Sequence, residues 1–332
     1  MLIDTDIYPG LIADFSEAVE RLWPTEFREG RLGLAVSGGP DSLALLLIAN
    51  AAMTGEIAVA SVDHGLRAEA AGEVALVEKV CRGLGVPFTA LSVTVEPGNL
   101  QAQAREARYD ALGAWAIAEG LGAVATAHHA DDQAETLLMR LARGSGLSGL
   151  AGVRSHGVFP GTHLPLIRPL LDKRKSVLQS VVDRAGIQAV QDPSNHDDRF
   201  DRVRVRKHLA DHDWLGVENL AESAGHLAEA WRAIEWFAQE DWETQVFRED
   251  DGFKYYANVP RVVAIETICR AVADIGRSVS RGDAGRAFDR LWREQNASLG
   301  GVLVTPGVER VEKAGVTMRV WRFAPEPPRR TH

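Results

Sequence analysis

The sequence contains few cysteines and no long hydrophobic run, and each absence excludes a class of protein. Cys81 and Cys269 are the two cysteines among 332 residues, and neither has a partner at metal-ligand spacing. This argues against a disulfide framework and a zinc site, and it predicts a reducing compartment. No stretch approaches the ~20 continuous apolar residues of a membrane span, and residues 1–6 lack the features of a signal peptide. We therefore expect a cytoplasmic protein without membrane contact.

The net charge of -9 conceals an uneven distribution along the chain. Residues 1–30 carry seven acids and two bases, and residues 211–252 carry twelve acids and two bases. Residues 140–210 carry thirteen Lys or Arg against six Asp or Glu. This basic stretch favours contact with a polyanion on an otherwise acidic protein, and the alternative is ordinary solvated charge.

The first ~200 residues alternate between apolar strands and amphipathic helices, which predicts a doubly wound, mostly parallel sheet. Three of the predicted strands end in polar clusters, Ser37–Ser42, Asp63–Arg67 and His128–Asp132. Because ligands bind outside the carboxyl ends of the strands in such sheets, we expect these clusters to converge on one site.

The first cluster, Ser-Gly-Gly-Pro-Asp-Ser, lies between a buried strand and a helix start. Its glycines allow the backbone to approach phosphate oxygens, and the backbone N–H groups at a helix N-terminus bind anions. A carboxylate facing phosphates is best explained if Mg²⁺ lies between them, which makes Asp41 a magnesium ligand. An ordinary turn between strand and helix is the alternative. The predicted nucleotide-binding residues are Ser37, Gly38, Gly39, Pro40, Asp41, Ser42, Asp63 and His64.

The third cluster opens a helix that runs toward Gly146. Ala134, Leu137, Leu138 and Leu141 are expected on its apolar face, and the opposite face collects polar residues. Acids in the first turn and arginines in the last are also what the helix dipole favours on a solvated face. Because the helix starts at the sheet edge, we favour a site, in which the acids hold Mg²⁺ or a cationic amine. The expected polar face consists of Asp132, Glu135, Thr136, Arg140 and Arg143.

The Ser37–Ser42 string resembles the SGGxDS signature of the PP-loop ATP pyrophosphatases, whose fold is of the adenine nucleotide alpha hydrolase type. That family splits ATP between its α- and β-phosphates. The ordered set of motifs resembles, more narrowly, the tRNA(Ile)-lysidine synthase family over residues 32–208. One departure is Val203, where that family more often has Asn. The motifs are Val62–Arg67, Ala104–Tyr109, Ala127–Thr136, Leu138–Gly146, Asp192–Asn195 and Arg202–Arg206.

The resemblance implies a specific ligase reaction. ATP adenylates C2 of the wobble cytidine, position 34, of the isoleucine tRNA with a CAU anticodon, and free L-lysine then displaces AMP to give lysidine. ATP and Mg²⁺ are the implied cofactors, tRNA(Ile) and lysine the partners, and a homodimer is compatible with the sequence. The candidate catalytic residues are Asp41, Asp131, Asp132 and Glu135.

Basic residues on three segments are candidates for tRNA contact, and the first is the end of the helix with Arg140 and Arg143. Charge and the Tyr109 ring favour RNA binding by the helix around Arg105, although a surface helix gives the same pattern. The third segment, Arg199–Lys207, packs five positive charges into nine residues, and it is either RNA-binding or a charged linker. The predicted RNA-binding residues are Arg105, Arg108, Arg140, Arg143, Arg202, Arg204, Arg206 and Lys207.

The patterning after residue 213 predicts a different domain. We expect a PP-loop catalytic domain over residues 1–212, and a helical accessory domain with a small C-terminal β element over 213–323, which contacts tRNA. Residues 324–332 are expected to form a disordered tail. Two other functions fit parts of the pattern: another PP-loop enzyme, such as a tRNA thiolase or a synthetase, and a non-catalytic nucleotide-binding module.

Overall fold

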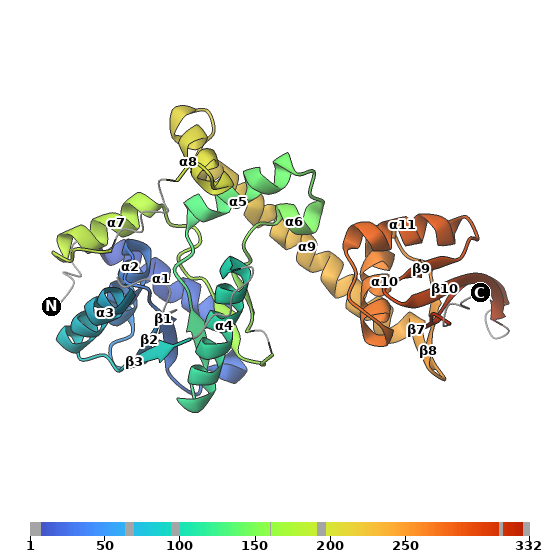
Figure 1. The fold of residues 1–332 in the computed structure, drawn as a ribbon, viewed down its shortest axis with the longest axis horizontal. Coiled ribbons are helices and arrows are strands. Elements are labelled where there is room, and N and C mark those ends of the chain that lie inside the picture. Colours follow the sequence, from blue (N-terminus) through green and yellow to red (C-terminus); the bar gives the residue numbers. More distant parts are fainter. Residues whose placement is uncertain are drawn as a thin grey trace. The chain divides into compact units, whose positions relative to one another are not determined.

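The computed structural model describes residues 8–63, 70–93, 100–159, 161–190, 197–311 and 315–327. The chain divides into two compact units, Met1–Ala228 and Glu229–His332. The division falls within one helix, α9 (Val217–Gln245), rather than at residue 212. Figure 1 shows both units, and each is described separately below.

The first unit is built on a six-stranded sheet with the order β3-β2-β1-β4-β6-β5. Neighbouring strands are parallel except at the β5–β6 edge. The first strand, β1, lies in the middle of the sheet. β2 and β3 follow on one side of β1, and the chain then crosses to β4 on the other side of β1. This confirms the predicted doubly wound, mostly parallel sheet. The strands are β1 (Leu32–Ala35), β2 (Ile57–Asp63), β3 (Phe88–Ser92), β4 (Ala123–Ala125), β5 (His156–Val158) and β6 (Pro165–Ile167).

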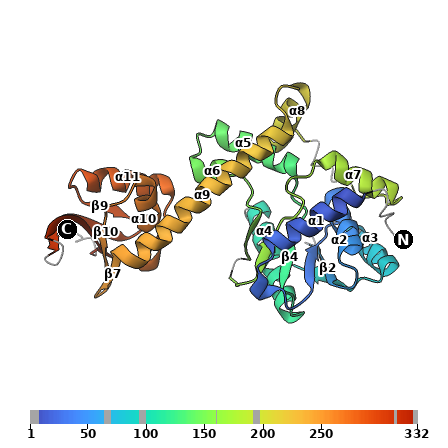
Figure 2. The same ribbon diagram turned by 180° about the vertical axis from the view of Figure 1, so that it is seen from behind.

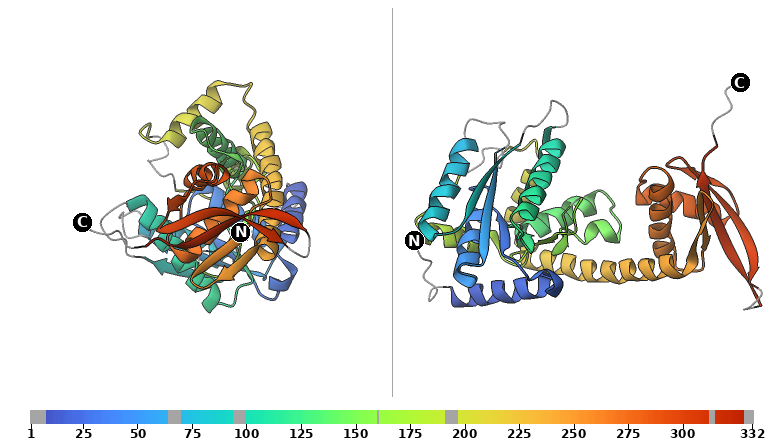
Figure 3. Two further views of the ribbon diagram at one scale, coloured as in Figure 1. Left: turned by 90° about the vertical axis from the view of Figure 1, so that its right-hand side faces the viewer. Right: turned by 90° about the horizontal axis from the view of Figure 1, so that it is seen from below.

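Helices cover both faces of this sheet (Figures 2 and 3). Helix α2 is apolar all round and is buried from Ser42 to Asn50, so it lies inside one layer rather than on its surface. Leu34 of β1 and Val77 of α3 belong to the same core as α2, whereas Trp115 of α4 packs on the other face. The layer on one face of the sheet consists of α1 (Pro9–Leu22), α2 (Pro40–Ala52), α3 (Ala70–Leu84) and α7 (Lys175–Arg184). Helix α4 (Leu100–Ala118) covers the opposite face.

The helices beyond the sheet edge form a smaller core. Ala130 and Ala134 of α5 pack with Val217 of α9 and Leu209 of α8. The predicted faces of α5 are partly wrong: Leu141 is 58% exposed, whereas Glu135 is 1% exposed. The reason is that α8 covers α5 on its acidic side and leaves Leu141 without a partner layer. The remaining elements are η1 (Thr25–Phe27), α5 (Ala130–Ala142), α6 (Leu147–Leu150) and α8 (Asp201–Asp211).

The second unit packs helices against an antiparallel sheet with the order β7-β8-β11-β10-β9. Tyr255, Phe288 and Trp321 form its aromatic centre. The sequence indicated strands only after residue 302, so the hairpin of β7 and β8 was not predicted, and β11 continues past Phe323. The elements are α10 (Arg261–Ile275), α11 (Arg281–Trp292), β7 (Val246–Glu249), β8 (Gly252–Tyr256), β9 (Ala297–Leu299), β10 (Val302–Val311) and β11 (Val316–Pro325).

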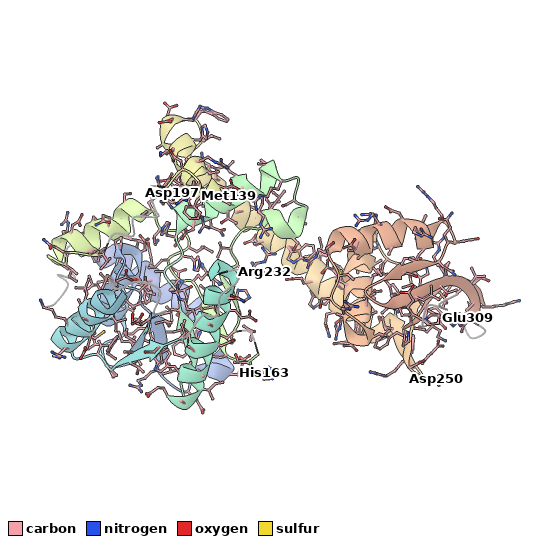
Figure 4. All side chains as sticks on the ribbon, in the orientation of Figure 1. Met139, His163, Asp197, Arg232, Asp250 and Glu309 are labelled. Carbon is pink, nitrogen blue, oxygen red and sulfur yellow. The ribbon has the colours of Figure 1, made fainter. Side chains whose placement is uncertain are left out.

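Glu309, labelled in Figure 4, marks the polar surface of this second sheet. It accepts a hydrogen bond from the Tyr256 hydroxyl over 2.9 Å and pairs with Arg322 at 3.1 Å. No helix within the described ranges is long and apolar enough to cross a membrane.

Candidate functional site

The phosphate loop between β1 and α2 holds its shape through its own hydroxyl groups. The Ser37 N–H donates to Ser42 Oγ over 3.1 Å, and Ser42 Oγ donates to the Gly39 carbonyl over 3.0 Å. Gly38 has a φ of +80°, and a Cβ there would lie 3.2 Å from the Glu73 carbonyl oxygen. Pro40 occupies the first turn of α2, where it needs no N–H partner. The loop therefore needs glycine at 38 and directs the N-terminus of α2 toward the sheet edge.

Asp41 has one carboxylate oxygen that finds no hydrogen-bond partner within the described part of the chain. Its Oδ1 is buried and accepts no hydrogen bond from the described residues. Its Oδ2 lies 3.5 Å from His129 Nε2 and 4.0 Å from Lys175 Nζ. An unsatisfied buried carboxylate oxygen is costly, and a cation would satisfy it. No group of three or more His, Cys, Asp or Glu within the described ranges could hold a metal ion. Magnesium at Asp41 would therefore need ligands from phosphate or water, as is usual for this ion.

His129 connects the phosphate loop to α5. It is 3% exposed and caps the helix reciprocally: the Asp132 N–H donates to His129 Nδ1 over 3.3 Å, and the His129 N–H donates to Asp132 Oδ2 over 3.2 Å. Because Nδ1 accepts, the neutral ring carries its proton on Nε2, which faces Asp41. Burial lowers the pKa of His129. Its hydrogen bond with Asp41 and the charges of Asp132, Asp41 and Asp131 raise this pKa by more than burial lowers it, so the net shift is upward.

Asp131 lies between His129 and the start of α7, and its Oδ2 is 3.8 Å from His129 Nδ1. Its Oδ2 accepts the Lys175 backbone N–H over 2.7 Å, and both of its oxygens meet the Arg174 guanidinium, at 3.3 and 3.4 Å. Burial favours the neutral acid, but these bonds to Lys175 and Arg174 outweigh it and hold the pKa of Asp131 below its usual range. Asp131 therefore remains ionised and fixes the N-terminus of α7.

Glu135 anchors α8 on α5. Arg206 Nε donates to Glu135 Oε1 over 2.7 Å, and Arg202 Nε lies 3.1 Å from Oε2. Arg202 also donates to the Thr136 hydroxyl over 3.2 Å. Figure 4 labels Met139, which lies on α5, and Asp197, which precedes α8. The two arginines therefore contact the acids of α5 in this structure.

The other predicted RNA-binding residues have varied surroundings. Arg143 pairs with Asp201 at 2.6 Å, Arg204 also pairs with Asp201, and Lys207 pairs with Asp198 at 2.6 Å. These three cations and two acids are exposed or half-buried, and pairs of this kind contribute little to stability. Arg140 is exposed and Arg108 is half-buried.

Some of the predicted site residues lie outside the described residues or directly next to a segment that is not described. Asp63 ends β2 half-buried, and its carbonyl accepts the Val93 N–H over 2.9 Å. His64, the Asp192–Asn195 motif and the side chain of Arg105 lie outside the described residues.

The sequence reasoning missed the segment after β6, which brings Arg168, Arg174 and Lys175 to the same sheet edge. Strand β6 pairs in parallel with β4, so its carboxyl end lies beside His128 and His129. Arg168 is 9% exposed and donates to the Arg154 carbonyl over 2.7 Å. The signal was the apolar run Leu164–Ile167, followed at once by arginine, which is the pattern of the three recognised clusters.

Comparisons with known proteins show the family and support the fold. A family model of the PP-loop domain matches residues 12–213. A tRNA(Ile)-lysidine synthase of Novosphingobium aromaticivorans is 42% identical over 312 residues, which cover 93% of each chain. That of Zymomonas mobilis is 36% identical over 95% of this chain and 94% of its own. The solved U34-tRNA thiolase NcsA from Methanococcus maripaludis has a TM-score of 0.53 at 16% identity, covering 66% of this chain and 78% of its own, which supports the fold alone. The chain belongs to the tRNA(Ile)-lysidine synthase family.

Proposed function

We propose that this enzyme ligates lysine to C2 of the wobble cytidine, position 34, of the CAU-anticodon isoleucine tRNA. An adenylated cytidine is the intermediate, and the products are lysidine, AMP and diphosphate. Family membership makes the chain an ATP-using, tRNA-modifying ligase, and the lysine and adenylate steps are the proposal. The observation that carries it is the contact of the phosphate loop with the acids of α5 through His129, which lies 3.5 Å from Asp41 Oδ2 and from Asp132 Oδ2.

The first half of the reaction would use the phosphate loop. Backbone N–H groups at the start of α2 bind the phosphates, and the Asp41 oxygen that lacks a partner would hold Mg²⁺. The ion would neutralise charge on the departing diphosphate. The Nε2–H of His129 faces Asp41 Oδ2, so His129 orients the carboxylate and leaves Oδ1 for the ion.

The second half needs an acid that holds the amine of lysine and accepts its proton. Asp131 contacts Arg174, and Glu135 contacts two arginines. Asp132 is partly exposed, and its Oδ1 has its nearest paired cation, Arg202, at 3.9 Å. Of the three acids, Asp132 is therefore best placed to bind a substrate ammonium group. Its other oxygen stays in the α5 cap and keeps the carboxylate oriented, as a general base requires.

The tRNA would contact the exposed cations of α5 and α8 and a surface of the second unit. In that unit the Arg319 guanidinium lies 3.7 Å from the centroid of the Trp292 ring, and Trp292 is 49% exposed. Stacked arginine and exposed aromatic groups are typical of contacts with unpaired bases. We expect Trp292→Ala to weaken tRNA binding about tenfold, measured by filter binding, and to leave ATP binding unchanged. Unchanged tRNA affinity would remove this surface from the proposal.

Sulfur transfer is disfavoured as an alternative. A thiolase that uses cysteine needs an accessible thiolate. Burial raises the pKa of the Cys81 thiol to about 12, and burial together with Glu266 raises that of Cys269 to about 11. Cys81 also lies in the apolar core of the first unit.

The deciding experiment incubates the purified enzyme with ATP, Mg²⁺, lysine and a tRNA transcript with a CAU anticodon. We expect release of AMP and diphosphate that depends on both lysine and tRNA, and a tRNA mass gain equal to lysine minus water. A transcript with a different base at position 34 is the control. Release of ADP, or no turnover, would contradict the proposal. A homodimer and a cytoplasmic location remain proposals based on the sequence.

A further inference from the structure

Three consecutive cations, Lys173, Arg174 and Lys175, precede and begin α7. The first two have close acidic partners. Lys173 Nζ lies 2.7 Å from Asp14 Oδ2, and Arg174 pairs with Glu218 at 2.7 Å and with Asp131 at 3.3 Å. These contacts engage both side chains with acids that are not part of the phosphate loop.

Lys175 is directed toward the phosphate loop. Its backbone N–H donates to Asp131 over 2.7 Å, which fixes where the side chain begins. Its ammonium group lies 4.0 Å from Asp41 Oδ2, at the outer limit of an ion pair, and the side chain is 34% exposed. The separation is too long for a hydrogen bond, so the ammonium group retains donors for another acceptor.

The position of Lys175 is set by rigid packing. Leu178 and Val182 of α7 share one buried core with Leu43 and Leu47 of α2. Side chains on two helices joined in this way keep their spacing, because a close-packed core does not deform continuously. The first turns of α2 and α7 therefore present Asp41 and Lys175 to the same region.

The loop Ser37–Ser42 contains no cationic residue, although it is expected to bind a ligand with several negative charges. In a Walker A loop this cation is the lysine at the end of the loop itself. Among the described residues, Lys175 supplies an ammonium group here, from a helix more than a hundred residues later in the chain. A divalent ion held by Asp41 would neutralise the carboxylate and weaken its attraction for the Lys175 ammonium group, which would leave that group for phosphate oxygens.

We propose that Lys175 binds the β- and γ-phosphates of ATP and the diphosphate released from it. This rests on the proposed function. In the adenylation step, the cytidine O2 forms a bond to the α-phosphorus, and the bond from that phosphorus to the αβ-bridging oxygen breaks. The electron pair stays on diphosphate, and Lys175 lies where it neutralises the added charge.

The test compares Lys175→Met with Lys175→Arg, with Lys173→Met as the matched control for loss of one charge. Binding of Mg·ATP, Mg·diphosphate and AMP is measured by titration calorimetry on the full-length chain, after circular dichroism has shown that each variant is folded. We expect Lys175→Met to weaken ATP and diphosphate binding about tenfold to a hundredfold and AMP binding less than about twofold. Lys175→Arg should retain most of the affinity, and Lys173→Met all of it.

Two outcomes would overturn the proposal. Binding of ATP and diphosphate by Lys175→Met at wild-type strength would show that the ammonium group makes no phosphate contact. An equal loss of AMP affinity would show that the substitution disturbs the whole site. The proposed function fails separately, if the wild-type enzyme binds ATP but forms no lysidine, and the binding comparison then still decides the role of Lys175.

Discussion

At the residue scale, four acids that look equivalent in the sequence have different surroundings. Asp41 keeps a buried oxygen without a partner in the described structure, whereas Asp131 is bound by the start of α7. Asp132 caps α5 through one oxygen, and Glu135 is 1% exposed between two arginines. The functional differences among these carboxylates therefore come from what each one contacts.

Asp41 gives the sharpest prediction. Asp41→Asn keeps the shape of the side chain but removes the charge that would hold Mg²⁺. We expect adenylation, followed as diphosphate release, to fall at least about a hundredfold, because charge neutralisation on the leaving group is lost. Binding of AMP without metal should be retained. Diphosphate release near the wild-type rate would refute the role of Asp41 as a magnesium ligand.

Asp241 makes the stability of the second unit depend on pH. It is 5% exposed, accepts a hydrogen bond from Thr267 over 2.9 Å, and has a pKa that burial raises above its ordinary value of 3.8. A raised pKa in the folded state favours the protonated acid, so the contribution of Asp241 to stability is present below pH 3.8 and is lost as pH rises through the folded value.

Asp241→Asn should therefore gain stability relative to the wild type as the pH rises. The measurement is urea unfolding of both proteins near pH 4.5 and near pH 7.5. The control is Asp251→Asn, which makes the same substitution at an exposed aspartate of this unit. If the free energies of unfolding of the wild type and Asp241→Asn differ by the same amount at both pH values, the pKa of Asp241 is the same in the folded and unfolded states.

At the element scale, the contact of α8 with α5 depends on a buried acid. Removing one partner of such a contact leaves the other charge poorly satisfied. We expect Glu135→Gln to destabilise the docking of α8 by about 1–3 kcal/mol and to speed amide hydrogen exchange over residues 201–211. Exchange in α7 should not change. If α8 exchanges as slowly as in the wild type while activity is lost, Glu135 acts on substrate instead.

Elements with a strong local pattern could be predicted from the sequence, and those that depend on a partner could not. β1, the Ser37–Ser42 loop and α2 follow from an apolar run, two glycines and a second apolar run. The burial of Glu135 depends on arginines about seventy residues away, which no local pattern reveals. β8 is stabilised by pairing with β11, and β7 in turn pairs with β8, so neither strand could be predicted from its local sequence pattern.

At the scale of the whole molecule, each unit has its own hydrophobic core. Because two cores allow separate cooperative transitions, calorimetry should show two unfolding steps. Mg·ATP at a hundred times its Kd should stabilise the first unit by about 2.7 kcal/mol and leave the transition of the second unit in place. A single transition that shifts as a whole would show that the helix shared by the units couples them fully.

The hydrogen bonds within the phosphate loop affect how ATP binds to it. Ser37 and Ser42 already bond to one another at 3.2 Å, and α2 behind them is buried along most of its length. Little conformational entropy remains to be lost when ATP binds, so capture should depend on encounter and desolvation rather than on loop ordering. We expect association kinetics with a single phase and a small change in heat capacity, as for a rigid receptor. A slow second phase would then report movement elsewhere, in the elements that carry tRNA or lysine.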